Sequence, residues 1–120
     1  MRGMIAVLVF VGAVASGPVA AFAADKAPKT RFWNLTGETV TKLELAPAGT
    51  QSWGPDQCKN DKDGDVDNDE RLKLEGVAAG TYDARMTFKG GRVCHAGGLK
   101  VEDGKVFSVE ADQLKDCSAK

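Results

Sequence analysis

The sequence predicts an all-β protein, a small antiparallel β-sandwich of six or seven short strands. Three observations lead to this prediction. Short segments alternate apolar and polar residues, as strands with one buried face do. Glycines and Asp-Gly pairs separate these segments and favour the tight turns of hairpins. No long apolar stripe recurs with the 3.6-residue period of a helix.

The N-terminus precedes this domain and has the pattern of a secretory signal peptide. A short basic start leads into an apolar run over residues 4–15, and small residues stand at Ala21 and Ala23. The run is short for a membrane span and is followed by Gly and Pro. We therefore expect a cleaved signal over residues 1–23, a single domain over residues 24–120 without a membrane span, and a periplasmic location.

The first strands are expected at residues 31–36, 39–46 and 71–75. The first is rich in aromatic and branched residues, and the other two alternate in hydrophobicity. Their expected inward-facing residues are Thr41, Leu43, Leu45, Leu72 and Leu74. Each of these segments therefore presents one apolar face to a shared core.

The second half of the domain repeats this pattern. A strand is expected at residues 81–88, and Gly90-Gly91 turns the chain into a partner strand beginning at residues 92–95. Its expected inward residues are Tyr82, Ala84, Met86 and Phe88. The alternating Leu99 and Val101 precede an Asp-Gly turn, a strand follows at residues 105–110, and residues 111–117 allow one helical turn.

The composition excludes several functional classes. The net charge of −1 provides no basic field for nucleic acid. The single histidine, His95, leaves little room for a zinc site or histidine-based catalysis. No nucleophile with a neighbouring base and no phosphate-binding loop is visible, so we expect no enzyme.

The expected export of the protein determines how its three cysteines are interpreted. In an oxidising compartment one disulfide and one remaining thiol are expected, and three pairings of Cys58, Cys94 and Cys117 are possible. We favour Cys94–Cys117, because that bond would hold the C-terminal tail against a strand and leave Cys58 free.

The segment at residues 56–70 departs from the strand pattern. It contains seven acids and two lysines, a local charge of −5. Asp61, Asp63, Asp65, Asp67 and Asp69 occupy alternate positions. Such carboxylates repel one another unless a cation lies among them.

The acidic segment partly matches a calcium-binding loop. Residues 61–65 supply acids at positions 1, 3 and 5, but Val66 and Leu72 replace the Gly and Glu of an EF-hand. An all-oxygen ligand set selects Ca²⁺, Mg²⁺, Mn²⁺ or a trivalent lanthanide. A plain solvated loop and a structural calcium site are the alternatives. A second copy could complete the coordination, which would give a metal-bridged homodimer.

The chain also resembles a family of small periplasmic proteins, the LanD type, encoded in the lanthanide-uptake gene clusters of methylotrophic bacteria. The resemblance is carried by Trp53-Gly54-Pro55-Asp56, the acidic residues 60–70, the following Arg71-Leu72-Lys73, and Cys94 and Cys117. It implies a small β-sandwich with a surface lanthanide site and exchange of metal with the EF-hand carrier lanmodulin. The ligand candidates are Asp61, Asp63, Asp65, Asp67, Asp69 and Glu70.

These observations together predict a periplasmic protein that binds a large hard cation. A lanthanide of the La or Nd type is expected, with Ca²⁺ as the alternative, for buffering or for transfer to another carrier. A metal-free envelope interaction module is the competing hypothesis. Trp53, close to the acidic segment in sequence, is expected to pack beneath it or to sensitise the emission of a bound lanthanide.

Overall fold

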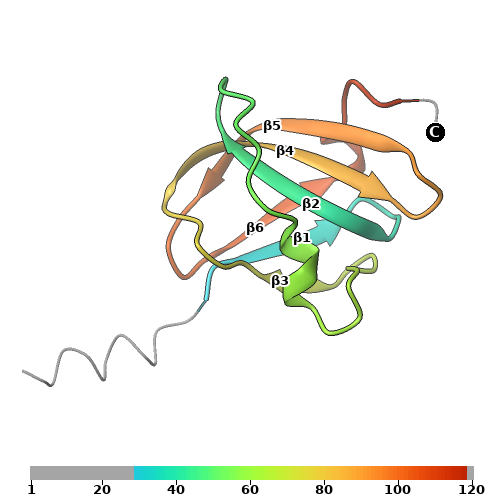
Figure 1. The fold of residues 1–120 in the computed structure, drawn as a ribbon, viewed down its shortest axis with the longest axis horizontal. Helices are drawn as coiled ribbons and strands as arrows, with labels where there is room; N and C mark the ends of the chain where they lie inside the picture. The colour runs from blue at the N-terminus through green and yellow to red at the C-terminus, as the bar shows by residue number, and fades with distance from the viewer. Residues whose placement is uncertain (1–28, 119–120) are drawn as a thin grey trace, which may run out of the picture.

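Six strands and two short 3-10 helices make up the part of the chain that the computed structural model describes, residues 29–118. The predicted signal peptide at residues 1–23 lies outside the described residues. The elements are β1 Arg31–Leu35, β2 Val40–Pro47, η1 Gln57–Asn60, β3 Arg71–Lys73, β4 Gly80–Phe88, β5 Val93–Val101, β6 Val106–Glu110 and η2 Ala111–Gln113 (Figure 1). The prediction of a small all-β fold is confirmed.

The strands form two three-stranded sheets, with the orders β3-β1-β6 and β2-β4-β5. In Figure 1, β2, β4 and β5 occupy the upper part of the molecule and the other three strands the lower part. The buried side chains of both sheets form one hydrophobic core. Phe32 of β1 and Phe107 of β6 contribute rings whose centroids lie 5.8 Å apart. The arrangement is therefore sandwich-like.

The β2-β4-β5 sheet is antiparallel throughout. The predicted inner face of β4 is correct: Ala84, Met86 and Phe88 are buried, and Tyr82 is half-buried against the core. The predicted face of β2 is wrong at one position. A register shift between Val40 and Lys42 buries Val40 in place of Thr41, because a bulge changes the alternation of side chains.

The β3-β1-β6 sheet differs from the expected antiparallel pattern in one pair. β1 and β3 are antiparallel, but β1 and β6 run parallel from Arg31↔Val106 to Leu35↔Glu110. The chain between them passes through the opposite sheet, and this long crossover allows β6 to run in the same direction as β1.

The C-terminal tail folds back onto β5. Cys94 and Cys117 form a disulfide, as predicted. Next to it, His95 and Lys115 exchange two backbone hydrogen bonds of 2.8 and 2.9 Å. The tail thus adds a short bridge to the edge of the β2-β4-β5 sheet. Within residues 29–118, no helix has the length and apolar content needed to cross a bilayer.

Candidate metal site in the acidic segment

The acidic segment begins at η1, whose N-terminus is capped by Asp56. This carboxylate accepts hydrogen bonds from the N–H of Cys58 at 2.9 Å and from the N–H of Leu43 at 3.0 Å. Asp56 therefore joins η1 to β2 and has a structural role.

Cys58, the cysteine outside the disulfide, is completely buried beneath this cap. Burial, followed by the negative charges of Asp56 and Asp65, raises the pKa of its thiol to about 12. A protonated, inaccessible thiol is a poor nucleophile and a poor metal ligand, so Cys58 acts as a core residue.

The first group of predicted ligands surrounds one tight turn. The Asp61 carboxylate accepts from the N–H of Asp63 at 2.9 Å, and the Asp61 carbonyl accepts from the N–H of Gly64 at 3.0 Å. Gly64 has a φ of +80°, which a residue with a side chain adopts with difficulty. The turn carries Asp61, Asp63 and Asp65, of which Asp63 is exposed and the other two are half-buried.

Val66 divides the acidic segment into two parts. Its side chain is 1 % exposed and belongs to the hydrophobic core. Its backbone exchanges hydrogen bonds of 2.8 and 2.9 Å with Val40 at the start of β2. The acids before and after Val66 consequently occupy separate turns.

The second group of predicted ligands is used within the fold. The Glu70 carboxylate accepts from the N–H of Asp67 at 2.9 Å, which closes the turn over residues 67–70. The Asp67 carboxylate accepts from the Thr39 hydroxyl at 2.9 Å, and the Asp69 carboxylate accepts from the indole N–H of Trp33 at 3.0 Å. Each of these three acids therefore contributes to the folded structure.

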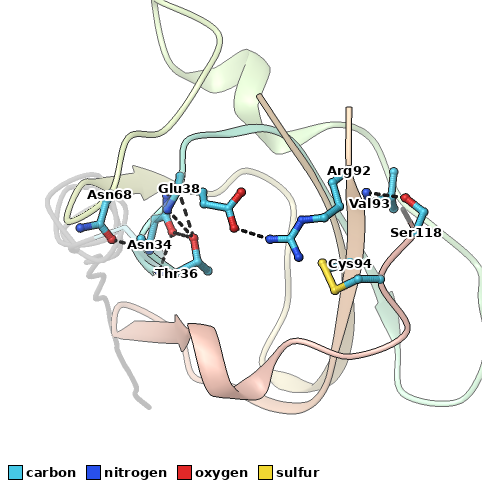
Figure 2. A network of polar contacts seen from close by, with 10 residues as sticks. Asn34, Thr36, Glu38, Asn68, Arg92, Val93, Cys94 and Ser118 are labelled. Carbon is cyan, nitrogen blue, oxygen red and sulfur yellow. Dashed lines mark hydrogen bonds and ion pairs between the residues drawn. A yellow bond between two sulfur atoms is a disulfide. The ribbon is translucent and has the colours of Figure 1, made fainter. Parts of the chain in front are cut away.

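Asn34 fixes this second turn to the end of β1. It is fully buried, and its Nδ2 donates to the carbonyls of Val66 at 2.9 Å and Glu38 at 2.7 Å. Its Oδ1 accepts from the backbone and hydroxyl of Thr36, while Asn68 accepts from the N–H of Gly37 (Figure 2). The same network ends at an ion pair between Glu38 and Arg92.

Asn34 and Trp33 belong to this site although the sequence pattern does not place either of them there. The alternation along β1 carried a usable signal for Asn34, because it shares the inward face with Phe32. The partnership of Trp33 with Asp69 joins residues 36 positions apart and has no local signal. Trp53 lies elsewhere, beside Arg85 and His95 on the outer face of the β2-β4-β5 sheet.

The charges of the predicted ligands are not neutralised by neighbouring side chains. None of the six acids forms an ion pair within 4.0 Å with a basic residue of the described chain. Across residues 29–118, no group of three or more His, Cys, Asp or Glu side chains is arranged to hold a metal ion. The segment therefore presents two negatively charged turns whose carboxylates do not converge on one point.

Comparison of the chain with protein-family models, curated proteins and solved structures found no match. A function for this protein is therefore inferred from its own residues.

Proposed function

We propose that the protein is a periplasmic binding protein for a large hard cation, in particular a trivalent lanthanide, and that the turn over residues 61–65 is the site of capture. The bound ion would be buffered or passed to another carrier, such as an EF-hand protein of the lanmodulin type. The carboxylate chemistry of the turn supports this proposal.

The observation that carries it is the state of Asp63 and Asp65. Neither carboxylate has a hydrogen-bond or ion-pair partner among the described residues, and both belong to the same turn as Asp61, whose carboxylate accepts from the N–H of Asp63. Carboxylates of like charge that border one turn repel one another, and a multivalent cation bound between them would relieve this repulsion. Oxygen-only ligands favour Ca²⁺ or a lanthanide over zinc or copper.

The number of ligands favours a shared site. Calcium takes roughly 6–8 oxygen ligands, and a lanthanide of similar size needs at least as many. Three carboxylates on one exposed turn provide fewer well-placed oxygens than this. Water or the same turn of a second copy would complete the shell, which is consistent with a metal-bridged homodimer.

A terbium titration tests the proposal. The indole of Trp33 is hydrogen-bonded to Asp69 in the turn over residues 67–70, so Trp-excited emission is read together with the heat of Tb³⁺ binding, which does not depend on the distance between the indole and the turn over residues 61–65. We expect Trp-excited Tb³⁺ emission that saturates at sub-micromolar concentration and survives excess Ca²⁺. Displacement of Tb³⁺ by equimolar Ca²⁺ would favour the calcium alternative, and the absence of saturable binding in both the emission and the heat would refute metal binding.

A matched pair of variants locates the ion. Asp63→Asn with Asp65→Asn removes the two unpartnered carboxylates but keeps side chains of the same shape. Asp103→Asn with Asp112→Asn changes the net charge equally at exposed positions outside the segment. We expect the first variant to bind Tb³⁺ at least 100-fold more weakly and the second to bind like the parent. Equal affinities in both variants would move the site elsewhere.

The second candidate function is a metal-free interaction module. It is favoured by the turn over residues 67–70, which is already held by Thr39, Trp33 and Asn34 without a cation among its carboxylates. A fixed acidic surface of this kind would attract a basic protein partner. Binding of poly-lysine without any saturable Tb³⁺ emission would support this alternative.

A further inference from the structure

A depression of about 390 Å³ lies on the outer face of the β2-β4-β5 sheet, away from the acidic segment. Its walls are formed by the segment after β2, by β4 and β5, and by the C-terminal tail. The lining includes Trp53, Asp83, Arg85, His95, Gly97 and Lys115. None belongs to residues 56–70, so this feature is independent of the proposed metal site.

Three basic side chains line the depression in one row. Arg85 of β4 pairs directly with His95 of β5, and His95 is bridged in turn to Lys115 of the tail. Neighbouring residues on antiparallel strands project their side chains to the same face. The row therefore places three nitrogen-bearing groups side by side across three segments.

Arg85 is held in place before any ligand arrives. Its Nε donates to the Glu44 carboxylate at 2.8 Å, and its guanidinium carbon lies 4.6 Å from the centre of the Trp53 ring. The two Nη nitrogens have no hydrogen-bond partner among the described residues. An arginine fixed by a half-buried carboxylate and an indole is pre-organised to bind a carboxylate with its remaining donors.

The floor of the depression is kept open by a bulge. Tyr82 pairs with Leu99 and Ala84 with Ala96, so Asp83 stands opposite both Gly97 and Gly98. Gly98 has a φ of +67°, typical of the glycine in such a bulge. A Cβ on Gly97 would lie 3.1 Å from Lys115 Nζ and 3.2 Å from Asp83 Oδ1.

The ammonium of Lys115 and the carboxylate of Asp83 thus face the same open space. They are not ion-paired within 4.0 Å, and the other oxygen of Asp83 accepts from the N–H of Gly49 at 2.9 Å. Two opposite charges that border one gap without contacting each other can both be satisfied by a ligand that carries both signs.

We propose that this depression binds a small zwitterion, namely a free α-amino acid with an apolar side chain. Its carboxylate is bound by Lys115 and the Nη donors of Arg85, its ammonium by Asp83, and its side chain lies against Trp53. A simple anion is disfavoured because Asp83 and Asp116 also line the depression. The volume is at the lower end of the range for small-molecule sites.

Three probes that share one aromatic body test the charge pattern. L-Phenylalanine carries both charges, 3-phenylpropionate only the carboxylate, and phenethylamine only the ammonium. Each is titrated into ¹⁵N-labelled protein in EDTA-containing buffer, which keeps this test independent of metal binding. We expect L-phenylalanine to shift the amides of His95, Gly97 and Gly98 with at least tenfold higher affinity than either single-charge probe.

Variants then assign the binding to these residues. Lys115→Gln and Asp83→Asn are expected to weaken L-phenylalanine binding about tenfold. Gly97→Ala, which fills the floor at an ordinary φ, is expected to weaken it further. Lys100→Gln removes a lysine from the exposed side of β5 outside the depression and serves as the control. Absence of shifts, equal binding of a single-charge probe, or equal loss in the control would overturn the proposal.

Discussion

Val66, in the middle of the most acidic stretch of the chain, is buried against Val40, and the two backbones exchange a pair of hydrogen bonds. This contact attaches the acidic segment to the start of β2. The carboxylates on either side are thereby held at the surface while the segment itself takes part in the hydrophobic core. One apolar residue thus attaches both acidic turns to the body of the fold.

Truncating Val66 should therefore loosen the acidic segment. We expect Val66→Ala to lower the free energy of unfolding by about 2 kcal/mol, because it removes two buried methyl groups and leaves a cavity. Urea denaturation measures this loss. Val106→Ala is the matched control, since Val106 is 45 % exposed and its truncation should cost less than about 0.5 kcal/mol. Equal losses would show that Val66 is not packed as described.

Removal of the Asn34 side chain should be costly for a different reason. Asn34→Ala leaves the buried Thr36 N–H and hydroxyl without their Oδ1 acceptor and deletes two donors to carbonyls. We expect this variant to lower the free energy of unfolding by about 2–3 kcal/mol. Asn68→Ala, which removes one exposed acceptor from the same network, should cost less than half as much. Thermal unfolding followed by circular dichroism compares the stability losses of the two variants. A larger loss in Asn68→Ala than in Asn34→Ala would contradict this network.

The Cys58 thiol should make stability depend on alkaline pH. Its pKa is about 12 in the folded protein against 9.0 without the fold, mainly because it is buried. Between these values the unfolded chain loses the thiol proton and the folded chain keeps it. The contribution of the protonated thiol to the free energy of unfolding is complete below pH 9. Between the two pKa values it declines by about 1.4 kcal/mol for each pH unit.

The variant Cys58→Ala isolates this effect. Urea denaturation at pH 8 and pH 10.5 should show that the parent loses more stability than the variant over this interval. Parallel pH curves for the two proteins would exclude a raised pKa. In the folded parent at pH 8, iodoacetamide should leave Cys58 unmodified until the protein unfolds.

Loss of the Cys94–Cys117 disulfide should destabilise the whole domain. The bond joins residues 23 positions apart. Closing a loop of this length with a disulfide stabilises the folded state by about 3 kcal/mol. We expect the variant Cys94→Ala, Cys117→Ser to unfold at a lower temperature than the oxidised parent and to be insensitive to dithiothreitol. An unchanged melting temperature would show that the tail is held by the His95–Lys115 bridge alone.

The strands were predictable because their alternation is local. In β4 every second residue faces the core, and the Gly-Gly turn before β5 and the disulfide of the tail were also anticipated correctly. The bulge in β2 and the parallel pairing of β1 with β6 were not, because each depends on contacts with strands distant in sequence. The hydrophobic pattern within one segment does not show which distant strand will pair with it or where a bulge will form.

The candidate site was less predictable than the fold. The five alternating aspartates predict one cluster of carboxylates. The structure instead divides them between two turns, because the side chain of Val66, in the middle of the run, is buried in the core. The proximity of Trp53 to the acidic segment along the chain was similarly misleading. Trp33, more than thirty residues from Asp69 in sequence, is the tryptophan that contacts it.

The parallel pairing of β1 with β6 has a consequence for the order of folding. The first strand of the domain needs the last strand as its neighbour, so the β3-β1-β6 sheet is incomplete until synthesis has passed Glu110. A chain with such distant partners has a high contact order and folds slowly. The delay leaves the apolar faces of β1 and β3 uncovered during synthesis, and it makes the nascent chain dependent on protection from aggregation until β6 has emerged.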